Sequence, residues 1–167
     1  MNQVLRLPGF TYFCDVLSPT GRLLDSFEVG NLIPQQAIDY VAGTFDGNGS
    51  IITNWYVGLF KNGFTPVAGT TAAQLPTTVG EFVGYSEAAR PAWNAVYDNL
   101  SRLDNQATVA EFTLTQDTTL YGAFIVSNST KGGGSGTLLS IARFPSPKQM
   151  ENGSTFKVRA GIDIVAG

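Results

Sequence analysis

The segment from residue 155 to residue 165 alternates apolar and polar side chains almost without interruption. Its apolar side chains share one parity, at Phe156, Val158, Ala160, Ile162 and Ile164. Charged side chains share the other parity, at Lys157, Arg159 and Asp163. Because successive side chains of a strand point to opposite faces, this pattern predicts a strand with one face on a core and one in water.

Further segments carry strand patterning between turns rich in Gly, Pro, Asn and Ser. They are Tyr12–Leu17 paired with Leu23–Val29, then Glu81–Arg90, Thr108–Gln116, Leu120–Val126 and Leu138–Phe144. The segment from 120 to 126 is nearly all apolar, which is typical of a central strand covered on both faces. Many short strands of this kind predict an all-β fold, an antiparallel β-sandwich that is jelly-roll-like, with a small barrel as the alternative.

One segment, NLIPQQAIDYVAGTF, predicts a single short helix over residues 34–42. Pro34 suits the first helical position, where a missing N–H costs nothing. Ala37, Ile38 and Val41 share one face, and Gly43 stands where a C-terminal cap is expected. A helix this short predicts a plug at one end of a β-core.

The stretch from Asn54 to Phe60 has apolar side chains on both parities. One face has Trp55, Val57 and Leu59, and the other has Tyr56, Gly58 and Phe60. We therefore expect both faces of this strand to be buried, with the helix at 34–42 covering one of them. Asn62-Gly63 is favoured in two-residue hairpins and predicts a return strand that begins at Phe64 and ends at Pro66.

Length and charge limit the domain count and the classes of partner. The 167 residues suffice for one β-sandwich domain, residues 11–167, preceded by an N-terminal arm, residues 1–10. The net charge of −3, with scattered Lys and Arg, argues against nucleic acid, which needs a basic face. No apolar run approaches the roughly 20 residues of a membrane-spanning helix. The first residues lack signal-peptide character, so we expect synthesis in the cytoplasm and no membrane partner.

The residue types exclude several kinds of catalytic site. The sequence contains no histidine, which removes Ser-His-Asp and Cys-His machinery and His-ligated metals. Cys14 is the single cysteine, so no disulfide forms within the chain, and its apolar neighbours predict a buried thiol. We therefore expect no catalytic, cofactor-binding or metal-binding residues.

Carboxylates leave two weaker options open. A hydrolase that uses two acids remains a third function, but Glu81 and Glu87 stand about 20 Å apart on an extended chain. The run Asp46-Gly-Asn-Gly-Ser begins like a calcium loop. Ile51 replaces the glycine that such a loop requires, and Val57 replaces its terminal Glu.

The run NSTKGGGSGT, residues 128–137, combines glycines with a lysine. A phosphate-binding P-loop would open a helix, whereas here a strand precedes the run and another strand follows it. The run therefore predicts a long, flexible hairpin tip that can become ordered against a neighbouring subunit.

Several stretches together resemble structural proteins of tailed-phage virions. They are NLIPQQAIDYV, WYVGLFKNGFTPVAGTTAA, EFVGYSEAARPAWN, and TLYGAFIVSNSTKGG with TLLSIARF. From about residue 23 onward the chain is similar to capsid decoration (cement) proteins. The resemblance implies a small β-rich, non-enzymatic protein on the capsid exterior of the virion. Its partners would be the major capsid protein, whose joints it stabilises, and itself, as a homodimer or homotrimer.

Three parts of the chain are candidate protein interfaces on this interpretation. They are the arm with Leu5, Leu7 and Phe10, the corner at Arg90 and Trp93, and the glycine-rich tip with Lys131 and Gly133. Many modest contacts suffice there, because a repeating lattice adds avidity. The alternative function is a carbohydrate- or receptor-binding module of a tail fibre or spike, in which Tyr85, Trp93 and Tyr97 stack on sugar rings.

Overall fold

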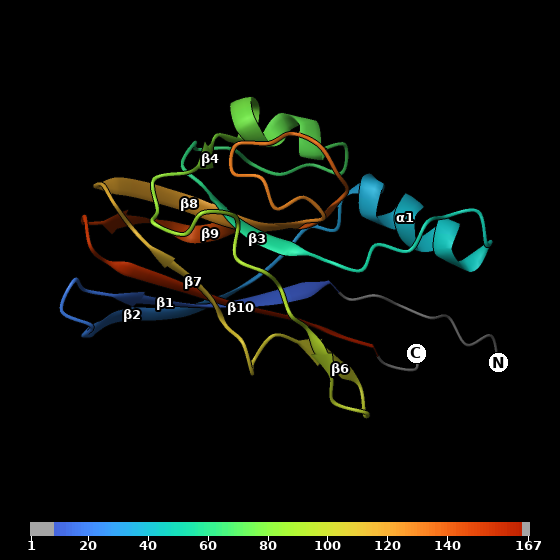
Figure 1. Ribbon diagram of the computed structural model, residues 1–167, viewed down its shortest axis with the longest axis horizontal. Coiled ribbons are helices and arrows are strands. Elements are labelled where there is room, and N and C mark those ends of the chain that lie inside the picture. The colour runs from blue at the N-terminus through green and yellow to red at the C-terminus, as the bar shows by residue number, and fades with distance from the viewer. Residues whose placement is uncertain (1–8, 165–167) are drawn as a thin grey trace.

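Strand β10 (Thr155–Asp163) lies at the centre of the first of two antiparallel sheets in the computed structural model, which describes residues 9–164 (Figure 1). On one side β10 pairs with β1 along its whole length, from Thr155 opposite Leu17 to Ile162 opposite Phe10. On the other side it pairs with β7 and then with β6. The inward residues of β10 are buried, which confirms the alternation expected from the sequence.

The first sheet has the order β2–β1–β10–β6–β5, with β7 also paired to β10. Its other strands are β1 (Phe10–Leu17), β2 (Leu23–Gly30), β5 (Val96–Tyr97), β6 (Arg102–Asp104) and β7 (Ala110–Thr113). The second sheet has the order β4–β3–β8–β9. Its strands are β3 (Tyr56–Phe60), β4 (Glu81–Phe82), β8 (Thr118–Val126) and β9 (Leu138–Met150).

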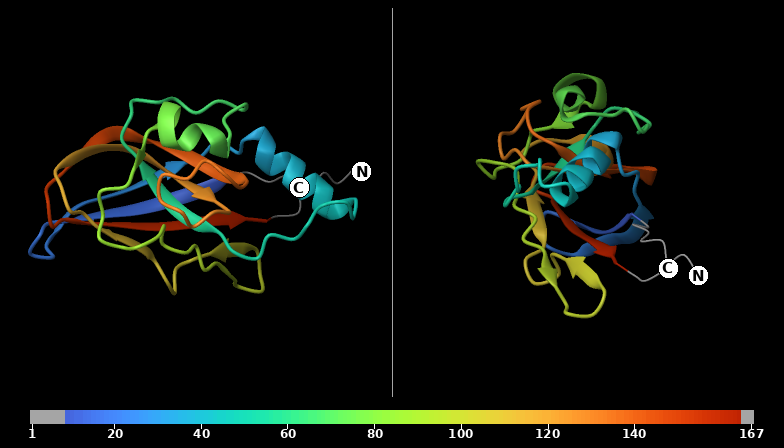
Figure 2. Two further views of the ribbon diagram at one scale, coloured as in Figure 1. Left: turned by 45° about the horizontal axis from the view of Figure 1, so that its top comes forward. Right: turned by 90° about the vertical axis from the view of Figure 1, so that its right-hand side faces the viewer.

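The sheets pack face to face, and within residues 9–164 they are joined by one α-helix and two short helical turns (Figures 1 and 2). These are α1 (Gln35–Phe45), η1 (Ala72–Gln74) and η2 (Leu75–Val79). The expected all-β antiparallel sandwich with one short helix is thereby confirmed. Among the described residues, no helix is long and apolar enough to cross a membrane.

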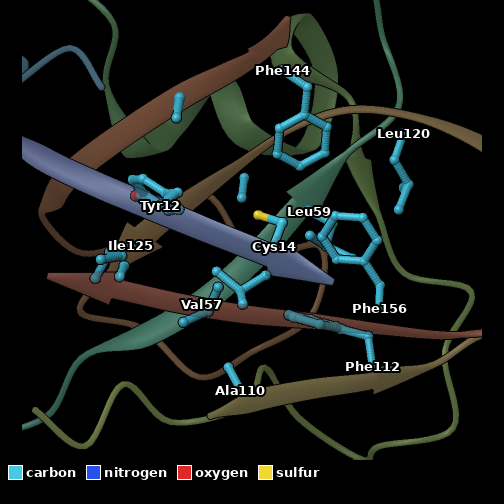
Figure 3. Close-up of a cluster of buried hydrophobic side chains, with 14 of the residues drawn as sticks. Tyr12, Cys14, Val57, Leu59, Ala110, Phe112, Leu120, Ile125, Phe144 and Phe156 are labelled. Atoms are coloured by element: carbon cyan, nitrogen blue, oxygen red, sulfur yellow. The ribbon is translucent and has the colours of Figure 1, made fainter. Parts of the chain in front are cut away.

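The main core fills the space between the sheets and includes Cys14 (Figure 3). The Cys14 side chain is enclosed, which confirms the buried thiol, and this burial raises the pKa of the thiol. Tyr12, two residues earlier, donates its hydroxyl hydrogen to Ser140 Oγ at 2.8 Å. The one polar group that Tyr12 brings into the core is therefore satisfied.

Strand β3 is buried on both faces, as expected, but α1 is not its cover. Val57 and Leu59 face the core between the sheets, and Phe60 faces a second cluster, built with Leu75 and Val79 of η2. The expected cover by the helix at 34–42 is thus wrong, because the helical turns at 72–79 occupy that face.

Packing against the neighbouring strand explains why residue 58, within β3, is a glycine. A Cβ at Gly58 would overlap the ring of Phe124, which lies directly over this position from β8. The absence of a side chain at residue 58 therefore makes room for an aromatic ring of the neighbouring strand.

Two local expectations on turns are wrong. The described chain from residue 61 to residue 71 forms no strand, because the guanidinium of Arg143 donates to the carbonyls of Gly63 and Phe64, at 2.7 and 2.9 Å. The helix α1 does not end at Gly43 but continues to Phe45. The Gly43 carbonyl accepts the N–H of Gly49 at 2.7 Å, and a Cβ at Gly49 would lie 2.8 Å from the Gly43 carbonyl carbon, so Gly49 is the glycine that permits this close approach.

Strand boundaries also differ from expectation in two places. The strand expected over residues 81–90 is limited to β4 and one bridge from Tyr85 to Leu114. Strands β5 and β6 were not expected at all. Phe10, assigned to the arm, is the first residue of β1, and residues 1–8 of that arm lie outside the described residues.

Candidate interaction site

The expected interface at Arg90 is inside the protein. Arg90 is 2% exposed, and its Nε and Nη2 atoms donate to the two carboxylate oxygens of Glu81, at 2.8 and 2.6 Å. The guanidinium also donates to the carbonyl oxygens of Asn128, at 2.8 Å, and Gly133, at 2.7 Å. A planar fork engaged in this way holds the chain's own loop and presents no free face to a partner.

Trp93 is buried as well, at 6% exposed. Its indole Nε1 donates to the carbonyl oxygen of Ala160 at 2.9 Å, which ties the chain to β10. Its ring meets that of Phe10 edge to face, with 5.5 Å between centroids. Phe10 and Trp93 therefore pack against each other in the domain, so neither is a surface contact residue in this chain.

The glycine-rich tip is fastened, in contrast to the flexible tip expected from its composition. The Lys131 Nζ atom donates to the carbonyl oxygens of Tyr85 and Glu87, both at 2.8 Å. The Gly132 N–H donates to Glu81 Oε2 at 2.9 Å, and Gly133 accepts from Arg90. We call Glu81, Arg90 and Lys131 the loop clamp.

The aromatic group considered for sugar stacking does not form one platform. Tyr85 and Trp93 are buried, and Tyr97 alone of the three is exposed. The rings of Tyr85 and Phe112 meet edge to face, at 5.0 Å, within the core. The carbohydrate-binding alternative therefore loses the side chains on which it was based.

The acids singled out in the sequence have structural partners. Glu81 belongs to the loop clamp, and the Glu87 carboxylate accepts the N–H of Thr113 at 3.1 Å. Asp46 caps the end of α1 and accepts the N–H of Asn48 at 2.9 Å. Within residues 9–164, no group of three or more His, Cys, Asp or Glu side chains is gathered as metal ligands would be. Leu5 and Leu7 lie outside the described residues.

In contrast to these buried residues, a short hairpin formed by β5 and β6, residues 96–104, carries exposed apolar side chains; we call it the exposed hairpin. It stands at one side of the first sheet (Figure 1). Three of its apolar side chains face solvent, with Val96 63%, Tyr97 46% and Leu100 82% exposed, whereas Leu103 packs against the main core. Exposed apolar groups gathered on one element mark interaction sites more often than scattered ones do.

The turn of the exposed hairpin is held by Asp98. Its Oδ1 atom accepts the N–H groups of Leu100, Ser101 and Arg102, at 2.8, 2.9 and 3.0 Å. The donated hydrogen bonds, that of Arg102 first, lower the pKa of the Asp98 carboxyl. Asn99 adopts the left-handed conformation, with φ 63°, which asparagine tolerates better than most residues.

Ion pairs hold the base of the exposed hairpin to β10. Arg102 pairs with Asp104 and Asp163, both at 2.9 Å, and Arg159 pairs with Asp104 at 2.7 Å. Burial raises the pKa of the Asp104 carboxyl, but hydrogen bonds from Gln106, Arg102 and Arg159 outweigh it and leave the pKa lowered. The hairpin is thus an ordered support for its apolar side chains.

Sequence patterning did not reveal the exposed hairpin. Its strands have two and three residues, too short for a recognisable alternation. The one available signal was Leu100, a large apolar residue inside a turn between Asn99 and Ser101.

Comparisons with known proteins found no relative: the chain matches no protein-family model, no curated protein and no solved structure.

Proposed function

We propose that this protein is a non-enzymatic capsid decoration protein of a tailed phage, and that the exposed hairpin is its contact with the shell. The resemblance in sequence supports the class of partner, a major capsid protein, and a location on the capsid exterior. The observation that carries the contact surface is the exposure of Val96, Tyr97 and Leu100 on an ordered turn.

The exposed hairpin is suited to binding because its backbone is already ordered in the free protein. Three N–H groups bound by Asp98 fix its turn before any partner arrives. The Tyr97 hydroxyl donates to the carbonyl oxygen of Leu100 at 2.9 Å, which also orients the ring. A pre-ordered contact avoids much of the entropy that a flexible loop loses on binding.

A lattice does not require each contact to be strong. The proposed partner repeats over the shell, and self-association as a dimer or trimer would place several hairpins on neighbouring copies of it. Each further contact is then intramolecular, so several contacts of modest free energy together give stable attachment.

A sedimentation assay with capsids that lack the protein tests this function. The purified protein should co-sediment at a fixed ratio to the major capsid protein. The double variant Val96→Ser, Leu100→Ser should weaken binding about a hundredfold, because burial of two such side chains contributes about 3 kcal/mol. The matched control is Leu23→Ser, Leu24→Ser, which removes a comparably exposed apolar pair from β2.

Two results would contradict the proposal. Wild-type protein that fails to sediment with capsids would remove the decoration role. Hairpin and control variants that bind equally well would leave the role standing but exclude the exposed hairpin as the contact.

A further inference from the structure

Strand β2 is the last strand on one side of the first sheet, beside β1 (Figure 1). Among the described residues, β1 is the only strand that pairs with it. All eight residues of β2 are exposed or partly exposed. A long strand with unpaired backbone groups along one side is a template to which another strand can be added.

The other edges of the two sheets are short, blocked or covered. Strands β4 and β5 have two residues each. Pro145 and Pro147 of β9 have no N–H to donate to a further strand. Thr113 of β7 is occupied, since its carbonyl accepts the N–H of Ser86 at 2.9 Å and its N–H donates to Glu87. Strand β2 contains neither proline nor lysine, the residues that commonly protect an edge.

Hydrogen bonding to β1 determines which backbone groups of β2 are free. The N–H of Asn31, the residue after β2, donates to the carbonyl of Phe10 at 3.1 Å. In an antiparallel pair, every second residue bonds to the same neighbour, so Phe27 also directs its backbone groups toward β1. The backbone groups of Ser26 and Glu28 therefore point away from the sheet.

The core beneath this edge is open on its outer flank. Phe27 and Val29 pack against the main core, and Phe27 is in register with the buried Cys14, yet both remain partly exposed. The Phe27 ring meets that of Phe144 at 5.0 Å between centroids, and Lys148 Nζ lies 4.2 Å from its centroid. A strand added beside β2 would cover the flank of this ring.

We propose that β2 pairs antiparallel with β2 of a second copy of this chain, about a two-fold axis at Phe27. Phe27 then lies opposite Phe27 of the second copy, as a non-hydrogen-bonded pair whose side chains approach closely. Aromatic pairs of this kind stabilise neighbouring strands. Ser26 lies opposite Glu28 on both sides of the axis, and these two pairs exchange about four hydrogen bonds between backbone groups.

Charge and packing select this register. Strand β2 contains two acids, Asp25 and Glu28, and no basic residue. An axis at either acid would place like charges directly opposite each other, which destabilises a strand pair. An axis at Ser26 would place Phe27 opposite Asp25 and lose the aromatic pair. The axis at Phe27 places each acid opposite an uncharged residue, and Asp25 is already paired with Lys148 at 2.8 Å.

A second copy suits this edge because the pairing is self-complementary. A two-fold pair uses the same surface on both copies and leaves neither edge free. The pairing deepens the self-association in the proposed function and rests on that function for its place on a shell. Leu23 and Leu24, the control pair for capsid binding, precede the paired residues 25–29 and lie at the bulge opposite Leu17.

Sedimentation equilibrium of the purified protein, without capsids, tests the pairing separately from the decoration role. The wild type should be a dimer. Glu28→Pro removes an N–H that points away from β1, so the bonds between β1 and β2 stay in place. The two-fold axis repeats this loss in both copies, so the dimer should weaken at least about thirtyfold. The matched control, Glu28→Ala, removes the same side chain but retains the N–H and should remain dimeric.

Three results would overturn the proposal. A wild type that stays monomeric would leave the edge to a strand of another protein. A trimer would exclude the pairing, because a two-fold contact closes after two copies. A Glu28→Pro dimer as stable as that of Glu28→Ala would show that the edge of β2 is not the contact. Thermal unfolding of both variants shows whether each is folded.

Disulfide trapping tests the register and needs no proline. The variants Ser26→Cys and Glu28→Cys are mixed in equal amounts, because opposite Cα atoms of such a pair lie about 5.5 Å apart, within the span of a disulfide. The mixture should form the 26–28 disulfide at least about tenfold faster than either variant alone forms a covalent dimer, since like positions are offset along the strands. The native thiol, Cys14, is buried and does not compete.

Non-reducing gels measure the rates of this trapping, and peptide mass spectrometry identifies the linked residues. Equal rates for the mixture and for the separate variants would overturn the proposed pairing, whatever the outcome of capsid sedimentation.

Discussion

The glycine-rich loop at 128–136 and the exposed hairpin at 96–104 are both polar, turn-rich connections, yet they are built in opposite ways. The loop directs two of its carbonyl oxygens inward to Arg90. Its own Lys131 in turn donates to the carbonyl oxygen of Tyr85 in the neighbouring chain segment. The hairpin keeps its polar groups for its own turn and directs Val96 and Leu100 outward. Composition alone therefore does not show which connection is available to a partner.

The physical difference lies in where charge is placed. In the loop clamp, a buried guanidinium is compensated by a carboxylate and two carbonyls, so removal of either partner leaves an unpaired charge. In the exposed hairpin, the ion pairs are partly solvated, and the side chains of Val96 and Leu100 are mostly exposed and so have little packing to lose. Substitutions should therefore affect stability in the first region and binding in the second.

The largest effect is expected for Arg90→Met. It leaves the buried Glu81 carboxylate without its partner, which should lower the free energy of unfolding by about 3–5 kcal/mol. Denaturant unfolding followed by tryptophan fluorescence measures this, with the exposed Arg22→Met as control. A loss below about 1 kcal/mol would mean that the loop clamp does not hold the loop.

A smaller loss is expected for Lys131→Met. Two hydrogen bonds to carbonyls and a cation–π contact with Tyr85, 4.0 Å from Nζ to the ring centroid, disappear. Lys131 is only partly buried, so the freed carbonyls gain some hydration, and we expect about 2 kcal/mol. Lys61→Met, at an exposed site, should change little in the same assay, and equal losses for both lysines would contradict the role given to Lys131.

The exposed hairpin should respond differently. Val96→Ser, Leu100→Ser removes no packed contact, so the free energy of unfolding should stay within about 0.5 kcal/mol of the wild type. The unfolding assay used for Arg90→Met applies unchanged. A loss as large as that of Lys131→Met would show that these side chains support the fold, and would weaken the proposed binding role.

The smallest effect concerns pH and the turn of the exposed hairpin. Because N–H groups, that of Arg102 first, lower the folded-state pKa of Asp98, its contribution is present above the unfolded pKa of about 3.9. That contribution is lost as the pH falls through the lower, folded-state pKa. Amide chemical shifts of Leu100 and Ser101 should therefore titrate with a midpoint below 3.9.

The variant Asp98→Asn supplies the control for this titration. Its amide shifts at Leu100 and Ser101 should show no such transition, because the titrating carboxyl is gone. A wild-type midpoint at or above the ordinary Asp value would contradict the hydrogen bonding described for the turn.

Long periodic segments were predicted well, because a strand with one buried face has apolar side chains at every second position. Strands β1, β2, β8 and β10 lie where the patterns placed them. The segment that covers β3 could not be predicted, since α1 and the turns at 72–79 both carry apolar residues that could pack on it, and only the structure shows that the turns do so. Strands β5 and β6 are too short for any period to be visible.

The candidate interface was harder to predict than the fold. Arg90 and Trp93 carry residue types typical of interfaces, and only their distant partners show that they are interior. Arg90 binds carbonyls 38 and 43 residues away along the chain, and Trp93 binds one that is 67 residues away. Hydrogen bonds between residues this far apart produce no pattern in the local sequence, so they could not be predicted from it.

The amino-acid sequence was sufficient for the fold class, the main strands, the helix α1 and the buried cysteine, because each depends on the local order of apolar and polar residues. The tertiary structure decided the sheet order, the inward course of the glycine-rich loop and the outward course of Val96, Tyr97 and Leu100. The reason is physical: whether a charge is buried or an apolar side chain exposed depends on the groups that surround it, and those come from remote parts of the chain.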